Sequence, residues 1–358
     1  MTEPNFIPRN YSKDLEKGSV TYQAPSNIAL VKYWGKYGVQ LPKNASVSFT
    51  LNNCHTTTTL HYDKNTNEEF KFEVYLDGKR EEGFEPKIEL FFERIEPYLP
   101  FLRNYSFKIE TSNSFPHSSG IASSASSMSA LALCLLNMEK EMLPDMTTDF
   151  FNKKASFIAR LGSGSASRSI DGPLVVWGHH PAIEASSLYY GIKYPYEVHE
   201  NFKNYQDTIL LVDKGEKLVS SSVGHKLMND HPFAEQRFNQ AHNNLDRLIA
   251  IFKKGELKQF IAVVEAEALQ LHAMMMTSTP NFILMKPHTL EIINRIRAYR
   301  KKTNSNVCFT LDAGANVHLL YPEAEKETVL KLVRTELTPF CKNGDFIMDR
   351  VGLGAIKV

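Results

Sequence analysis

The sequence has 358 residues, of which 42% are hydrophobic and 23% are charged, as in ordinary globular proteins. It holds 41 Lys and Arg against 40 Asp and Glu, which excludes a general attraction to nucleic acid or anionic membranes. At about 150 residues per domain, the length predicts two domains. The four cysteines form no CxxC pair. With no apolar run long enough to span a membrane and no apolar signal core, we expect reduced thiols and a cytoplasmic protein.

The first half of the chain alternates strand-like and helical patterns. Strands are indicated by β-branched or alternating apolar residues, and helices by apolar residues three or four positions apart. In chain order, the patterns predict strands at 47–62 and 68–78, a helix at 88–99, a strand at 105–115, helices from Ser124 and from 147 to Gly162, and a strand at 172–178.

The second half has long helical patterns. It predicts a strand at 207–213, helices at 234–255, 256–276 and 287–303, strand-like residues at 306–321, a helix at 323–337 and a strand at 346–353. The pattern changes near residues 200–207. We therefore predict two α+β domains, residues 1–205 and 206–358.

A serine-rich loop precedes the helix that starts near Ser124, in the stretch "FPHSSGIASSASSMSALALCLL". Free N–H groups and the positive dipole end at a helix N-terminus favour an anion. Phosphate binding is therefore expected at Ser118, Ser119, Gly120, Ser123 and Ser124. The alternative is a serine-rich helix cap, and the spacing is not that of a P-loop.

A second motif, "NIALVKYWGK", places Lys32, Tyr33 and Lys36 at the end of an apolar strand. Two lysines and a phenol there could hold a polyphosphate or a carboxylate. The alternative is an edge strand whose lysines are solvated.

Two further motifs carry polar groups between apolar segments. In "ARLGSGSASRS", Ser163, Ser165 and Arg168 could cradle a carboxylate or phosphate, because arginine offers a planar fork of donors. In "CFTLDAGANV", Asp312 ends a strand and is followed by small residues, although an ordinary Asp-initiated turn would look the same. "LVSSSVG" adds a serine cluster that includes Ser220 and Ser221.

In this order, these motifs resemble the mevalonate diphosphate decarboxylases, a family within the superfamily of galactokinase, homoserine kinase, mevalonate kinase and phosphomevalonate kinase (GHMP). The likeness extends from about residue 22 to the end. It implies the two-domain GHMP-kinase fold, with an N-terminal α+β domain, a C-terminal ferredoxin-like domain and an active-site cleft between them. It also implies ATP as co-substrate, Mg²⁺ near Ser124, small-molecule substrates and a possible homodimer, with neither nucleic acid nor membrane as a partner.

The resemblance also implies a reaction and a role for each motif. ATP would phosphorylate the 3-hydroxyl of mevalonate 5-diphosphate, and loss of phosphate and CO₂ would give isopentenyl diphosphate. Asp312 would take or orient the hydroxyl proton, with Lys32 beside it, and Arg168 would hold the carboxylate. The 5-diphosphate would be bound by Tyr33, Lys36, Ser163 and Ser165, with Ser220 and Ser221 completing the cleft.

The family pattern is not matched everywhere, and other functions stay open. His225 stands where methionine is common, and Asp171 and Pro173 stand where an aromatic residue and a glycine are expected. The alternatives are a mevalonate 5-phosphate decarboxylase giving isopentenyl phosphate, a mevalonate 3-kinase, and an inactive, ligand-binding member of the fold. The adenine pocket is expected somewhere between Thr56 and Arg103.

Overall fold

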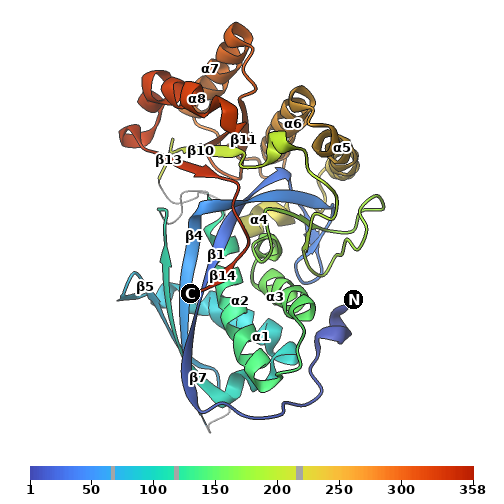
Figure 1. Ribbon diagram of the computed structural model, residues 1–358, viewed down its shortest axis with the longest axis vertical. Helices are drawn as coiled ribbons and strands as arrows, with labels where there is room; N and C mark the ends of the chain where they lie inside the picture. The colour runs from blue at the N-terminus through green and yellow to red at the C-terminus, as the bar shows by residue number, and fades with distance from the viewer. Residues whose placement is uncertain (66–68, 117–120, 215–220) are drawn as a thin grey trace.

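The computed structural model describes residues 1–65, 69–116, 121–214 and 221–358. In it, two sheets lie end to end, each backed by helices (Figure 1). The larger sheet has the strand order β14-β1-β4-β7-β5-β6, with β8 paired to β4 and β9 to β8, and only the pairing of β5 with β7 is parallel in this part of the chain. Its strands are β1 (Lys17–Val31), β4 (Ser46–Lys64), β5 (Lys71–Leu76), β6 (Lys79–Arg80), β7 (Tyr105–Asn113), β8 (Leu174–Trp177), β9 (Ile192–Lys193) and β14 (Ile356–Lys357).

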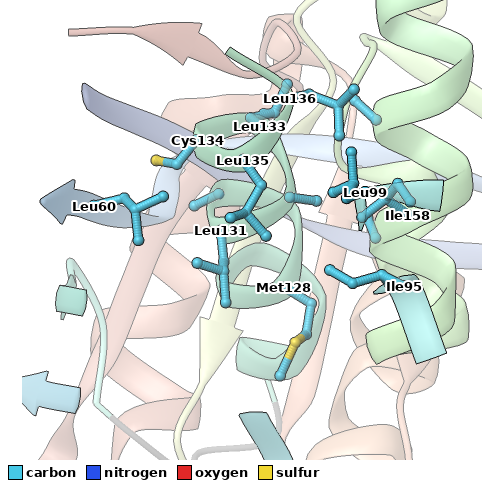
Figure 2. Packing of buried hydrophobic residues seen from close by; sticks show 14 of the residues in the cluster. Leu60, Ile95, Leu99, Met128, Leu131, Leu133, Cys134, Leu135, Leu136 and Ile158 are labelled. Atoms are coloured by element: carbon cyan, nitrogen blue, oxygen red, sulfur yellow. The ribbon is translucent and has the colours of Figure 1, made fainter. Parts of the chain in front are cut away.

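Three helices cover one face of the large sheet: α1 (Glu85–Ile95), α2 (Ser123–Met142) and α3 (Thr148–Gly162) (Figure 1). The central helix, α2, is buried on nearly all sides because it packs against β1 and β4 on one side and against α3 on the other. Figure 2 shows Leu60 and Cys134 on the sheet side of α2, with Ile158 of α3 on the far side. All four cysteines are free, as predicted, and all four are buried.

The second sheet has the ferredoxin-like order β11-β12-β10-β13, with every pairing antiparallel. Its strands are β10 (Gln206–Leu210), β11 (Cys308–Leu311), β12 (Val317–Tyr321) and β13 (Phe346–Arg350). The helices of this half are α4 (Ser221–Lys226), α5 (Ala234–Lys254), α6 (Leu257–Met276), α7 (Pro287–Thr303) and α8 (Lys326–Leu332). The predicted α+β fold class is thereby confirmed.

Short elements complete the chain. A two-stranded hairpin, β2 (Lys36–Tyr37) and β3 (Leu41–Pro42), follows β1. The helix predicted at 323–337 is instead a 3₁₀ turn (Glu323–Glu325), α8 and a π-helical turn (Val333–Leu337). Regular bonding does not continue beyond this turn, because Pro339 lacks an N–H. Other 3₁₀ turns lie at Glu3–Phe6, Glu82–Phe84, Glu96–Tyr98, Pro100–Asn104, Gly164–Arg168 (η5), Glu200–Phe202, Thr338–Phe340 and Lys342–Gly344.

The two sheets share structure at their junction. One buried hydrophobic cluster draws side chains from β1 and β4 as well as from α5, α6 and β10. The C-terminal residues leave the small sheet and return to the large one, where β14 pairs with β1 (Figure 1). Within the described residues, every helix is too short or too polar to cross a bilayer.

Candidate active site

A cavity of 480 Å³ lies where the end of β1, the start of α2, η5, α4 and the loop after β11 come together. It therefore takes side chains from both halves of the chain. It brings together nine predicted site residues: Lys32, Tyr33, Lys36, Ser123, Ser124, Ser163, Ser165, Arg168 and Asp312.

Lys32 follows β1 and is only 1% exposed. Its backbone is held on both sides: its N–H donates to Glu267 Oε2 (2.9 Å), and its carbonyl accepts from Asn44 Nδ2 (3.0 Å). Among the described residues, its ammonium has no hydrogen-bond partner. Burial lowers the pKa of Lys32 to about 8, against the opposing influence of Asp312 and Glu267. The alternative of solvated lysines is wrong for Lys32, since its side chain is buried.

Arg168 ends η5 and is 2% exposed. Its Nε donates to Ser48 Oγ and its Nη1 to Ser46 Oγ, both at 2.6 Å, and its guanidinium carbon lies 5.7 Å from the ring centroid of Trp177. Burial lowers the pKa of Arg168 to about 10, while Tyr33 acts in the opposite direction. Neutral hydroxyls fix this guanidinium in orientation without neutralising its charge. The two serines were not predicted, although their alternation in "SVS" puts them on one face of β4.

Asp312 comes directly after β11, and its half-buried side chain lines the cavity. Its backbone carbonyl accepts a hydrogen bond from Nε2 of His272 (3.1 Å). Burial lowers the pKa of His272 to about 4, so this imidazole is neutral and acts as the donor. Asp312 raises the pKa values of both Lys32 and Arg168, so its carboxylate is in electrostatic contact with both cations.

Tyr33 and His225 form an aromatic wall. The Tyr33 ring lies 4.7 Å from that of Trp177 and 4.3 Å from that of His225, and its buried hydroxyl has no hydrogen-bond partner among the described residues. Nδ1 of His225 accepts from the N–H of Gly35 (2.9 Å). Burial, assisted by Lys36, lowers the pKa of His225 to about 3. The imidazole is therefore neutral, with its proton on Nε2.

The N-terminus of α2 borders the cavity. Ala122 occupies the cap position with φ 48° and ψ 38°, and no side chain caps the helix, so the alternative of a serine cap is not what the described residues show. Ser123 and Ser124 line the cavity, and Ser124 Oγ lies 3.3 Å from Ser163 Oγ. Ser163 Oγ in turn lies 3.4 Å from Ser165 Oγ.

Some predicted site residues cannot be placed here. Ser118, Ser119, Gly120 and Ser220 lie outside the described residues. Ser221 starts α4, and its side chain is not described.

The cavity also includes polar residues that sequence reasoning did not assign to a site, notably Asn27, Gln40 and Lys87. Gln40 accepts a hydrogen bond from Lys36 Nζ (2.8 Å) across the β2–β3 hairpin. Lys87, on α1, borders a second cavity as well. Lys87 stands in a sequence pattern typical of a surface helix, so its place at the two cavities could be found only from the fold.

The second cavity, of 230 Å³, adjoins the N-terminus of α2 and has mostly apolar walls. It shares Lys87, Ser123 and Ser124 with the first cavity. Its other lining residues come from β4, β5, β7, α2 and the start of the α1 segment: Thr58, Val74, Leu76, Phe84, Ile88, Ile109, Thr111, Asn113, Ser127, Met128 and Leu131.

Comparison with known proteins agrees with this architecture. A family model for the diphosphomevalonate decarboxylase-like N-terminal domain matches residues 24–188, and one for the mevalonate 5-diphosphate decarboxylase C-terminal domain matches residues 208–352. The diphosphomevalonate decarboxylase of Ganoderma lucidum is 28% identical over 335 residues, covering 87% of this chain and 80% of the relative.

Two solved structures are also similar. The mevalonate diphosphate decarboxylase of Staphylococcus aureus superposes with a TM-score of 0.82 at 27% identity, covering 96% of this chain and 98% of the other. The protein MDDEF, solved in complex with MVAPP, AMPPCP and magnesium, gives a TM-score of 0.80 at 27% identity, covering 95% and 98% of the two chains. With both family models matched along most of its length, the chain belongs to the diphosphomevalonate decarboxylase family.

Proposed function

We propose that this chain catalyses the ATP-dependent decarboxylation of mevalonate 5-diphosphate to isopentenyl diphosphate, through phosphorylation of the 3-hydroxyl and loss of phosphate and CO₂. One observation carries this proposal. Asp312, Lys32 and Arg168 line the same 480 Å³ cavity as the N-terminus of α2, which no side chain of the described residues caps. A carboxylate, two buried cations and an anion-binding helix end are the groups that phosphorylation and decarboxylation of a hydroxy acid require.

The first step is phosphoryl transfer to a tertiary alcohol. Asp312 accepts or orients the hydroxyl proton, and the ammonium of Lys32 keeps this carboxylate ionised. Because hydroxide is a poor leaving group, the 3-hydroxyl must become a phosphate ester before carbon–carbon cleavage.

The second step breaks two σ bonds and forms two π bonds, one in the alkene and one in CO₂, where a lone pair of the carboxylate oxygen becomes the second C=O bond. The C3–O bond breaks as phosphate leaves, and the C–C bond to the carboxylate breaks with it. The electron pair of that C–C bond becomes the new double bond, and CO₂ departs. Arg168 holds the carboxylate through the edge of its guanidinium that Ser46 and Ser48 leave available. No further reductant or oxidant is needed.

The 5-diphosphate is assigned to the Tyr33, Lys36, Ser163 and Ser165 cluster. The Tyr33 hydroxyl, which has no partner in the described part of the chain, and the close spacing of the two serine hydroxyls support this assignment. Ser220 and Ser221 would close the cleft from the second half of the chain. His225 adds a neutral N–H donor to this wall.

ATP is assigned to the region where the two cavities meet. Its phosphates would lie against the N-terminus of α2, with Ser123, Ser124 and the preceding Ser118, Ser119 and Gly120. The apolar 230 Å³ cavity suits an adenine ring, and several of its walls come from the Thr56–Arg103 segment where this pocket was expected.

The donors near Ser124 suit Mg²⁺ held largely by nucleotide phosphates and water, since the described residues contain no cluster of three His, Cys, Asp or Glu side chains around a metal position. When bound, Mg²⁺ would neutralise phosphate charge.

The predicted domain limits, 1–205 and 206–358, the cytoplasmic location and the homodimer stay predictions.

The test is a turnover assay of the purified protein with ATP and Mg²⁺, supplied with either mevalonate 5-diphosphate or mevalonate 5-phosphate, with ADP and CO₂ measured together. We expect equal amounts of ADP and CO₂ from the diphosphate. ADP without CO₂ would identify a 3-kinase instead, turnover of the monophosphate alone would identify the other decarboxylase, and no turnover would favour a ligand-binding protein.

A further inference from the structure

A buried carboxylate on α6 reaches the backbone of the proposed catalytic lysine. Glu267 is 0% exposed, and its Oε2 accepts the N–H of Lys32 at 2.9 Å. From α5, Arg237 donates to both carboxylate oxygens (3.1 and 2.5 Å), and Asn244 donates to Oε1 at 2.6 Å. The carboxylate is therefore held by four hydrogen bonds, one of which belongs to Lys32.

Besides its hydrogen bond to the Lys32 backbone, Glu267 acts on the Lys32 ammonium through its negative charge. Burial disfavours the ammonium form of Lys32, while Asp312 and then Glu267 raise its pKa. A buried ion pair between Glu267 and Arg237 contributes little net stability compared with an apolar pair of similar size. The packing of α5 on α6 therefore does not explain why a carboxylate is buried here. The nearby buried ammonium of Lys32 does explain it, because a negative charge stabilises that ammonium.

The other charged and titratable groups that face Lys32 cannot replace Glu267. Arg168 on η5 opposes the charge of Lys32, and His272 on α6 is neutral. Asp207 on β10 is paired with His318 at 2.7 Å, and burial raises the pKa of Asp207. Asp312 loses its negative charge whenever it takes the proton of the substrate hydroxyl. Asp207 also raises the pKa of Lys32, but Glu267 acts more strongly and is hydrogen-bonded to the Lys32 backbone as well.

We propose that Glu267 is a positioning residue of the decarboxylation, which fixes the Lys32 backbone beside the substrate and keeps the Lys32 ammonium charged while Asp312 carries the substrate proton. Arg237 and Asn244 set the orientation of the carboxylate. This inference rests on the proposed function, but its electrostatic part can be measured without turnover.

The experiment measures the pKa of Lys32 from the pH dependence of its ¹³Cε NMR signal, assigned by the loss of that signal in Lys32→Met. Glu267→Gln keeps an acceptor for the Lys32 N–H but removes the charge, so we expect the Lys32 pKa to fall by about one pH unit. Arg237→Gln leaves the carboxylate uncompensated, so we expect a rise. The alkaline limb of kcat/KM should move in the same direction in each variant.

The matched control is Glu139→Gln, which removes the charge from another fully buried ion pair, between α2 and α3, where Lys154 Nζ lies 2.6 Å from Glu139 Oε1. We expect it to lower the melting temperature without moving the Lys32 pKa.

Opposite shifts for Glu267→Gln and Arg237→Gln support the proposal. An unchanged Lys32 pKa, or shifts of the same sign in both variants, overturns it and leaves Glu267 a structural residue. If Glu267→Gln does not fold, the Lys32 pKa in Arg237→Gln decides: a rise supports the proposal, and a fall or no change overturns it. Absence of turnover in the unaltered protein, with the NMR shifts as expected, would instead overturn the proposed function.

Discussion

Replacing Lys32 by methionine should stabilise the protein while abolishing its activity. The pKa of Lys32 falls from 10.5 to about 8 because the ammonium is fully buried. At about 1.4 kcal/mol per pH unit, this difference corresponds to a cost of about 3 kcal/mol for the charged form in the folded state. Methionine has nearly the same length and no charge. We therefore expect the free energy of unfolding at pH 7 to rise by up to about 3 kcal/mol.

The sign of the pH dependence follows from the same values. Between about pH 8 and 10.5 the unfolded chain binds more protons at Lys32 than the folded one, so the stability of the unaltered protein rises with pH. The advantage of Lys32→Met should therefore shrink by about 1 kcal/mol between pH 7 and pH 9. Urea unfolding of both proteins at the two pH values measures this difference, and turnover of mevalonate 5-diphosphate is measured alongside.

Lys154→Met is the matched control. Lys154 is equally buried, but its ammonium donates to Glu139 Oε1 at 2.6 Å and to the carbonyl of Tyr98 at 2.9 Å. Its loss leaves the Glu139 carboxylate unpaired, which should destabilise the protein by about 3 kcal/mol. If Lys32→Met were destabilised to a similar extent, this would refute the reasoning that burial of the Lys32 ammonium costs the folded protein stability.

Three other predictions concern the cavity walls. Asp312→Asn should lower kcat by a factor of about 10²–10⁴ while ATP still binds, which nucleotide titration would check; near-normal turnover would exclude the assigned role. Arg168→Lys should be equally severe in a CO₂ assay, because an ammonium cannot bond Ser46, Ser48 and a carboxylate in one plane, and a mild effect would contradict this. Leu76→Trp should fill the 230 Å³ cavity and raise the KM for ATP about tenfold without changing the KM for mevalonate 5-diphosphate, whereas equal changes in both would argue against an adenine pocket there.

Local patterns were sufficient to predict most of the fold. Helices such as α5 and α6 have long amphipathic patterns separated by Gly255, which takes φ 74° at the end of α5. The return of β14 to β1 could not be predicted, because a two-residue strand has no periodicity and depends on which edge is free. Long-range pairing of this kind is decided by tertiary structure.

The candidate site was predictable where its residues stand in compact motifs, as Lys32 and Arg168 do. Residues of the site that lie in the middle of a helix or a strand were not predicted. Glu267 and Arg237 occur within ordinary helical patterns, and Ser46 and Ser48 within a strand, so their sequence context resembles that of any polar surface residue. Glu267 and Arg237 reach the end of β1 only because α5 and α6 pack there, and Ser46 and Ser48 meet Arg168 only because η5 lies against β4.

The hydrophobic cluster shared by β1, β4, α5, α6 and β10 has a consequence for cooperativity. Since neither half can keep that cluster covered by itself, the two halves should unfold in a single transition. Trp177 lies in the first half and Trp34 packs against residues of the second half such as Leu271, whereas α5 to α7 contribute much of the helical signal of the second half. Tryptophan fluorescence and far-ultraviolet circular dichroism should therefore report the same urea midpoint, and two separate midpoints would show that each half folds alone. Asp312 and Lys32 come from different halves of the chain. If the halves unfold only together, these two side chains stay next to each other in every folded molecule.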